Sequence, residues 1–206
     1  MKLVGLYAIL DPAACRGREP LVVAEAILRG GCAALQLRDK TAGDGEVLAL
    51  ARALRARARA AGVPFVVDDR LDVAIACEAD GVHLGQDDLP IAIARAQAPW
   101  LQVGISTHDE AQRARAEREG ADLVGFGPVF PTSSKERPDA LVGLAGVERA
   151  TRASSIPVVA IGGIDLSRAP ALRAHGVTLA AAISAVCAAD DPEASARALH
   201  RALGGT

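Results

Sequence analysis

The sequence predicts an α/β protein, a single (β/α)8 TIM barrel formed by one domain over residues 1–206. Three observations predict this class. Short apolar segments alternate eight times with segments of helical periodicity, no linker interrupts them, and a hydrophobic content of 50% is enough for a large core. The alternative is a doubly wound open sheet, which usually has fewer β/α units in a chain of this length.

The eight expected strands share one pattern, a short apolar or β-branched run bounded by polar residues. This pattern is typical of parallel strands that are buried on both faces. The runs FVV and GVHL show it most clearly. In chain order, the expected strands cover residues 3–10, 33–37, 65–67, 81–84, 102–105, 123–126, 157–161 and 178–183.

The eight expected helices are indicated by start and stop signals and by apolar residues at helical spacing. Pro20 suits the first turn of a helix, and Gly30 with Gly31 ends that helix. Thr107 and Glu110 match a capping box, which predicts that a helix begins immediately after Ser106. In chain order, the expected helices cover residues 20–29, 44–61, 71–79, 90–96, 109–119, 144–153, 167–174 and 192–203.

The composition excludes several classes of function. A net charge of −2 provides no basic field for nucleic acid, and one Trp, one Tyr and three Phe leave few surfaces for base stacking. Four scattered cysteines fit neither a zinc site nor a secreted scaffold and favour a reducing, cytoplasmic compartment. We expect no membrane association, because no apolar run reaches 18 residues. Among the histidines, we expect His83 in a strand, His108 at a helix start, and His175 and His200 on the surface.

Pairs of acidic residues follow two neighbouring strands of the predicted barrel. Asp68 and Asp69 follow one strand, and Asp87 and Asp88 follow the next. Carboxyl ends of parallel strands lie on the same side, so the four acids should converge and repel one another unless a cation lies among them. Oxygen ligands without Cys or His favour Mg²⁺, which needs only one or two carboxylates plus substrate phosphates. The alternative is that some of these acids cap helices or solvate loops.

Active sites of this fold lie at the carboxyl ends of the strands. Cations, acids, hydroxyls and a glycine pair are expected there, and the longest loop, residues 127–142, adds the segment PTSSKERPD. This combination suits a metal-bound polyphosphate and a second phosphate. The residues at these ends are Arg38, Lys40, Asp69, Asp88, Ser106, Thr132, Lys135, Gly162, Gly163 and Ser184.

Seven motifs, in matching order over nearly the whole chain, resemble the thiamine phosphate synthase family. They are QLRDK, VDDRLDVA, GVHLGQDDLP, GISTH, GFGPVFPTSSK, AIGGI and AAISAV. The resemblance implies a transferase of thiamine biosynthesis that joins hydroxymethylpyrimidine diphosphate to thiazole phosphate and releases pyrophosphate. It leaves open whether the thiazole is plain or carboxylated, and whether the protein forms a homo-oligomer.

The resemblance also implies roles for individual residues. Asp69 and Asp88 would bind Mg²⁺, and Arg38, Lys135 and Ser106 would be catalytic through the diphosphate. The residues that would bind the two small-molecule substrates are Gln36, Leu37, Arg38, Asp39, Lys40, Asp68, Ser106, Thr132, Ser133, Ser134, Lys135, Gly162, Gly163, Ile183 and Ser184.

Two departures from the family pattern and two alternative functions remain. The family usually has Asn at the position of Asp68 and Thr at that of Ser134, and Asp68 adds a charge beside an anionic substrate. A related thiazole tautomerase resembles the chain overall but typically has His at the position of Pro128. A noncatalytic, phosphate-binding regulatory barrel is disfavoured because Asp69, Asp88 and Lys135 are all present.

Overall fold

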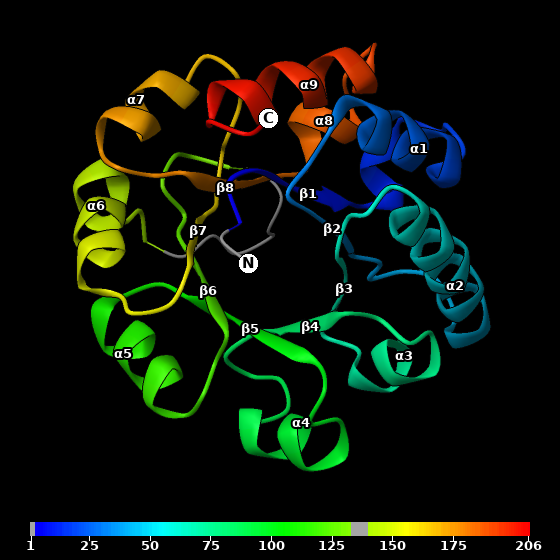
Figure 1. The fold of residues 1–206 in the computed structure, drawn as a ribbon, viewed down its shortest axis with the longest axis horizontal. Helices are drawn as coiled ribbons and strands as arrows, with labels where there is room; N and C mark the ends of the chain where they lie inside the picture. The colour runs from blue at the N-terminus through cyan, green and yellow to red at the C-terminus, as the bar shows by residue number, and fades with distance from the viewer. Residues whose placement is uncertain (1–2, 133–139) are drawn as a thin grey trace.

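The computed structural model describes residues 3–132 and 140–206. Over these residues, eight parallel strands close into a barrel in the order β1 to β8, as Figure 1 shows. The predicted (β/α)8 barrel is therefore confirmed. The strands are β1 (Gly5–Leu10), β2 (Ala34–Leu37), β3 (Phe65–Asp68), β4 (Gly81–Leu84), β5 (Gln102–Thr107), β6 (Leu123–Phe126), β7 (Val158–Ala160) and β8 (Leu179–Ala182).

Helices surround the barrel and follow the strands in turn (Figure 1). Each of the eight predicted helices has a counterpart, whereas the 3-10 helix η1 after β1 and the short helix α8 after β8 were not predicted. The helical elements are η1 (Pro12–Cys15), α1 (Pro20–Gly30), α2 (Asp44–Ala60), α3 (Leu71–Ala76), α4 (Ile91–Gln97), α5 (Glu110–Arg118), α6 (Gly143–Ala153), α7 (Ala169–Ala174), α8 (Ser184–Cys187) and α9 (Pro192–Ala202).

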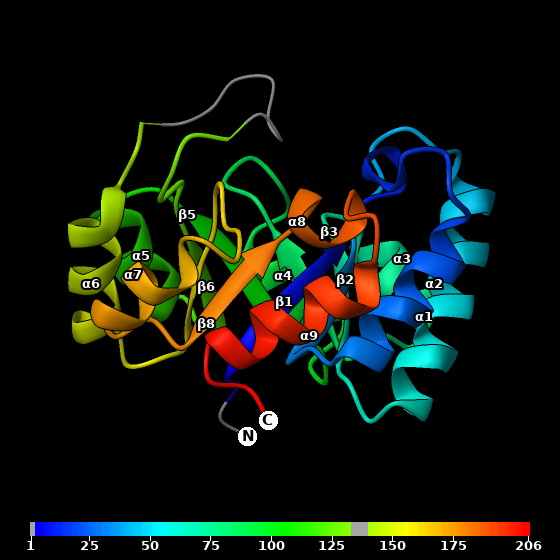
Figure 2. The ribbon, with the colours of Figure 1, turned by 90° about the horizontal axis from the view of Figure 1, so that it is seen from above.

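Alternate residues of each strand face the barrel interior and the surrounding helices. In β1, Tyr7 and Ile9 belong to the inner cluster, and Leu6, Ala8 and Leu10 belong to the larger cluster under the helices. Burial on both faces explains why the strands lack the alternation of apolar and polar residues seen in half-exposed sheets. Loops at the carboxyl ends of the strands lie on one face of the barrel, and the C-terminus lies at the other (Figure 2).

Two predictions were wrong. Thr107 does not start a capping box, because it lies in β5 and its hydroxyl donates to the Gly125 carbonyl at 2.8 Å. Asp109 is the N-cap of α5 instead, and its Oδ1 accepts from the Gln112 N–H at 2.8 Å. His200 is not a surface residue, since it is 8% exposed and its Nδ1 accepts from the Leu6 N–H at 3.1 Å.

Cys15, Cys32, Cys77 and Cys187 are free and buried. Among the helices of the described residues, none is long and apolar enough to cross a membrane.

Candidate active site

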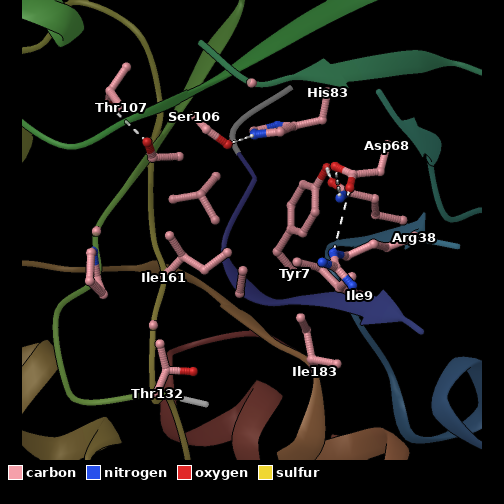
Figure 3. A pocket seen from close by; sticks show the side chains of 18 of the residues that line it. Tyr7, Ile9, Arg38, Asp68, His83, Ser106, Thr107, Thr132, Ile161 and Ile183 are labelled. Carbon is pink, nitrogen blue, oxygen red and sulfur yellow. Dashed lines mark hydrogen bonds and ion pairs between the residues drawn. The ribbon is translucent and has the colours of Figure 1, made fainter. Parts of the chain in front are cut away.

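A cavity of about 500 Å³ opens at the carboxyl ends of the strands. Figure 3 shows Tyr7, Arg38 and Asp68 grouped on one side of it, with Thr132 and Ile161 on the other. The first side carries the charged residues from β2 to β4, and the second is mostly backbone and aliphatic side chains from β6 to β8. The cavity therefore offers an ionic wall and a less polar wall to a ligand.

A chain of hydrogen bonds fixes the amide of Gln36 in the ionic wall. The Tyr7 hydroxyl donates to Gln36 Oε1 at 2.8 Å, and Gln36 Nε2 donates to Asp68 Oδ1 at 2.8 Å. The two donors come from β1 and β2, where the strand register pairs Gln36 with Ile9, two residues after Tyr7 on the same face of β1. Burial, with the nearby Asp68 charge, raises the pKa of Tyr7, so its hydroxyl stays protonated and serves as a donor.

Two cations that follow β2 lie against two acids at the end of β3. Asp68 Oδ2 is 3.8 Å from both Arg38 Nε and Lys40 Nζ, and Lys40 also pairs with Asp69. Burial raises the pKa of Asp68 to about 6, although Lys40 and Arg38 act in the opposite direction. The extra charge of Asp68 is therefore compensated partly by ion pairs and partly by a greater tendency to bind a proton.

Asp69 has an unusual backbone conformation that directs its side chain. Its φ of 59° lies in the left-handed region, where few residues other than glycine are found, although Asp is among the commoner exceptions. The conformation is held because the Asp69 N–H donates to the His83 carbonyl at 2.7 Å. The turn lets Asp69 reach Lys40 and line the cavity, while the chain continues into α3.

His83 extends from β4 into the barrel beside Ser106. Its Nε2 lies 3.0 Å from Ser106 Oγ, and burial lowers its pKa to about 4, so the imidazole is neutral at pH 7. Glycines on the next two strands make room for the ring, since a Cβ at Gly104 would lie 2.5 Å from His83 Nδ1 and one at Gly125 would lie 3.3 Å from Cε1. Among the described residues, His83 Nδ1 has no hydrogen-bond partner.

The donor set at the ends of β3 and β4 suits a magnesium ion. Asp69 and Asp88 both line the cavity, and Asp88 Oδ2 also accepts from the Gly85 N–H at 2.6 Å. Within residues 3–132 and 140–206, no group of three or more His, Cys, Asp or Glu residues could hold a metal ion. Two carboxylates are nevertheless sufficient for Mg²⁺ when substrate phosphates complete its coordination.

On the other wall, the glycine pair after β7 allows two loops to meet. Gly162 and Gly163 have φ values of 97° and 62°. A Cβ at Gly162 would lie 2.5 Å from Pro128 Cβ, and one at Gly163 would lie 2.5 Å from the Pro131 carbonyl oxygen. These glycines are therefore needed both for their backbone conformation and for close packing against the loop after β6.

The structure brings most of the predicted site residues to this cavity. Leu37 instead packs in the core, and Asp39 turns back to its own loop, where its carboxylate accepts from the N–H groups of Thr41 and Ala42. Ser133, Ser134 and Lys135 lie outside the described residues. The predicted residues that line the cavity are Gln36, Arg38, Lys40, Asp68, Asp69, Asp88, Ser106, Thr132, Gly162, Gly163, Ile183 and Ser184.

Sequence reasoning missed several residues of the cavity wall. Tyr7 and His83 lie in the middle of strands, and Gln86 and His108 lie in the loops after β4 and β5. The His108 ring is held by a contact of 2.7 Å between its Nδ1 and the Gly127 carbonyl. A polar residue in the middle of an otherwise apolar strand was the available signal for Tyr7 and His83, since buried polar groups need a partner or a function.

The fold and the cavity together define an enzyme of the (β/α)8-barrel class with a site suited to phosphorylated ligands. The sequence profile described as thiamine monophosphate synthase matches residues 6–186. The chain belongs to this family. It is therefore a transferase of thiamine biosynthesis.

Individual relatives agree with this assignment. The chain is 44% identical over 195 residues to the thiamine-phosphate synthase of Chloroflexus aurantiacus. This match covers 95% of this chain and 90% of the relative. It is 45% identical over 188 residues to that of Chlorobium luteolum, with 91% and 89% covered. A solved structure of thiamine phosphate pyrophosphorylase from Pyrococcus furiosus superposes with a TM-score of 0.89 at 38% identity, covering 97% of this chain and 95% of that one.

Proposed function

We propose that the cavity catalyses the Mg²⁺-dependent joining of hydroxymethylpyrimidine diphosphate to thiazole phosphate, with release of pyrophosphate. The observation that carries the proposal is the ionic wall, where Arg38 and Lys40 lie beside Asp68 and Asp69 and where Asp88 lines the same cavity. A diphosphate needs cations, and its bound metal needs carboxylates. The names of the relatives and the order of the motifs support the same reaction.

Each wall would hold one substrate. The amide of Gln36, already oriented by Tyr7 and Asp68, would contact the pyrimidine, while Arg38, Lys40 and Ser106 would contact the diphosphate. The thiazole phosphate would lie on the other wall. Its proposed contacts are Thr132, Ser133, Ser134, Gly162, Gly163, Ile183 and Ser184.

Catalysis in this proposal is mainly positioning and charge neutralisation. The bond from the pyrimidinylmethyl carbon to the diphosphate oxygen breaks, the electron-rich ring stabilises the cation, and the thiazole nitrogen then bonds to that carbon. Arg38, Lys135 and Ser106 stabilise the departing pyrophosphate, so no side-chain nucleophile is needed. The neutral His83 ring, whose Nε2 lies 3.0 Å from Ser106 Oγ, orients the Ser106 hydroxyl.

Asp69 and Asp88 would hold the magnesium ion, which would neutralise the leaving diphosphate. Lys40 pairs with Asp69 and would have to release or share it when the ion binds. Removing the metal with a chelator is therefore expected to abolish turnover and to weaken diphosphate binding.

The test is to incubate the protein with both substrates and Mg²⁺ and to look for thiamine phosphate. Lys135→Ala is expected to slow pyrophosphate release by about 10² or more, because a charge proposed to stabilise the leaving diphosphate is removed. An isomerised thiazole without thiamine phosphate would instead indicate the tautomerase, which the cavity-lining Pro128 disfavours because proline has no titratable side chain. Ligand binding without any product would indicate a regulatory barrel.

A further inference from the structure

We infer that Asp11, which lies behind the cavity wall, is a positioning residue that holds the Arg38 guanidinium in place for the substrate diphosphate. The inference rests on the function proposed above, in which Arg38 contacts that diphosphate. Arg38 lines the cavity, whereas Asp11 is 8% exposed and is not among the described residues that line it. Asp11 would therefore act on the reaction through Arg38 and without touching the substrate.

Both oxygens of the Asp11 carboxylate are engaged. Oδ2 accepts from Arg38 Nη1 at 2.5 Å, and Oδ1 accepts from the Ala13 N–H at 3.0 Å as the N-cap of η1. The Arg38 N–H donates to the Leu10 carbonyl at 2.9 Å, so pairing of β1 with β2 sets the two residues opposite each other. Because the Ala13 N–H holds Oδ1, Oδ2 is in a defined position, and its charge-assisted bond orients the guanidinium.

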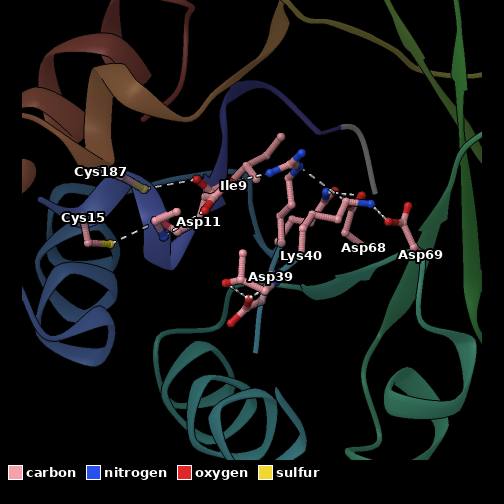
Figure 4. Close-up of polar contacts among 12 residues, drawn as sticks. Ile9, Asp11, Cys15, Asp39, Lys40, Asp68, Asp69 and Cys187 are labelled. Atoms are coloured by element: carbon pink, nitrogen blue, oxygen red, sulfur yellow. Dashed lines mark hydrogen bonds and ion pairs between the residues drawn. The ribbon is translucent and has the colours of Figure 1, made fainter. Parts of the chain in front are cut away.

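The segment that carries Asp11 is also held from behind. The Cys187 thiol donates to the Ile9 carbonyl at 3.2 Å, and the Cys15 thiol donates to the Asp11 carbonyl at 3.4 Å. Arg18 links the two cysteines, since Nε donates to the Cys15 carbonyl at 3.0 Å and Nη2 to the Cys187 carbonyl at 2.5 Å. Figure 4 shows Asp11 between the cysteines and the group formed by Lys40 and Asp68. The backbone on both sides of Asp11 is thus held by side-chain hydrogen bonds.

Asp68 is a second acid near Arg38, and it competes with Asp11 for the guanidinium. Asp68 Oδ2 lies 3.8 Å from Arg38 Nε, compared with 2.5 Å between Asp11 Oδ2 and Arg38 Nη1. Without the Asp11 charge, Arg38 would be free to turn toward Asp68. It would then be paired inside the ionic wall and less available to the diphosphate.

The experiment compares wild type with Asp11→Asn, which keeps an oxygen for the Ala13 N–H but removes the charge that binds Arg38. Asp191→Asn is the matched control, since Asp191 also caps a helix before a proline and accepts from the Ala194 N–H at 2.9 Å. We expect Asp11→Asn to raise the KM for the pyrimidine diphosphate about tenfold or more. The KM for thiazole phosphate should stay within about twofold, and Asp191→Asn should match wild type.

A double-mutant cycle separates positioning from a general loss of structure. In an Arg38→Met background, Asp11→Asn is expected to raise the KM for the diphosphate no further, because the group it positions is absent. Asp11→Ser, which offers a capping hydroxyl without a charge, should reproduce Asp11→Asn and provides a second variant if the first folds poorly.

An unchanged diphosphate KM in the Asp11 variants, or an equal increase with and without Arg38, would overturn the inference while leaving the proposed function intact. Absence of thiamine phosphate from the wild-type reaction would overturn the proposed function and this inference together.

Discussion

Besides the proposed metal ligands Asp69 and Asp88, the cavity carries Asp68, whose charge would repel an anionic substrate. At an effective dielectric constant of 20, a carboxylate about 4 Å from a phosphate costs about 4 kcal/mol per pair of unit charges. In the structure this charge is opposed by Arg38 and Lys40, each 3.8 Å away, and Oδ1 serves as the acceptor for Gln36. Protonation by burial and a place beside Mg²⁺ are two ways to compensate this charge. Ion pairing with Arg38 and Lys40 adds a third form of compensation.

Asp68→Asn is expected to retain most activity, because the amide oxygen can still accept from Gln36 Nε2. Asp69→Asn removes a proposed metal ligand and is expected to lose about 10² or more in rate. The measurement is a Mg²⁺ titration of the turnover of both variants. A higher Mg²⁺ requirement in Asp68→Asn would place Asp68 beside the metal, and an unchanged requirement would favour protonation or ion pairing.

The control for this comparison is the rate at saturating Mg²⁺. If Asp68→Asn were as inactive there as Asp69→Asn, compensation by protonation, by the metal or by the two cations would fail as an explanation. Asp68 would then need a direct role in the chemistry.

At the scale of elements, the loops after β6 and β7 depend on each other. The Val129 N–H donates to the Ile161 carbonyl at 2.8 Å, and the Phe130 N–H donates to the Gly162 carbonyl at 3.1 Å. Arg168 further joins them, because its guanidinium lies 4.8 Å from the centre of the Phe130 ring. The glycine pair thus helps to place the loop that leads to Thr132.

Gly162→Ala tests this dependence. It should destabilise the fold by about 3 kcal/mol or more, because a left-handed conformation and a contact of 2.5 Å with Pro128 Cβ both oppose a methyl group. Gly176→Ala is the matched control, since Gly176 has a φ of 77° but nothing within 4 Å of its added Cβ, and about 1 to 2 kcal/mol is expected. Urea unfolding measures both.

The same pair of variants should differ in substrate binding. Only Gly162→Ala is expected to raise the KM for thiazole phosphate, because it alone displaces the loop after β6. Equal destabilisation of the two variants, with unchanged kinetics, would show that the conformation of Gly162 matters and its packing does not.

For the whole molecule, buried histidines should make stability depend on pH. Burial lowers the pKa of His200 from 6.5 and that of His83 to about 4. The unfolded chain therefore binds more protons than the folded chain below about pH 6.5, so stability falls as pH falls. Asp68 acts with the opposite sign, since its folded pKa of about 6 exceeds its unfolded value of 3.8.

Urea unfolding of the wild type at pH 7.5 and pH 5 is expected to show lower stability at pH 5, because two buried histidines act against one buried carboxyl group. His200→Asn should reduce the loss of stability between these two values, because one buried titrating group is removed. His175→Asn is the control, since the His175 side chain is 33% exposed. An identical pH dependence in wild type and His200→Asn would contradict a role for His200.

The sequence alone determined the order of the elements and most of the charged site, because both depend on local patterns. Apolar runs, helical periodicity and glycine stops specify β/α units, and parallel strands place their carboxyl ends on one face. Residues next to those ends, such as Arg38, Asp69 and Ser106, were therefore predictable. The motif resemblance then predicted the family.

Only the tertiary structure decided how these residues are paired. The contact of Asp11 with Arg38 joins residues 27 positions apart, and that of His83 with Ser106 joins residues 23 apart. His200, the predicted surface residue, is buried because it meets Leu6, 194 positions away. Closure of the barrel sets such contacts through strand register and packing, so no local pattern in the chain records them.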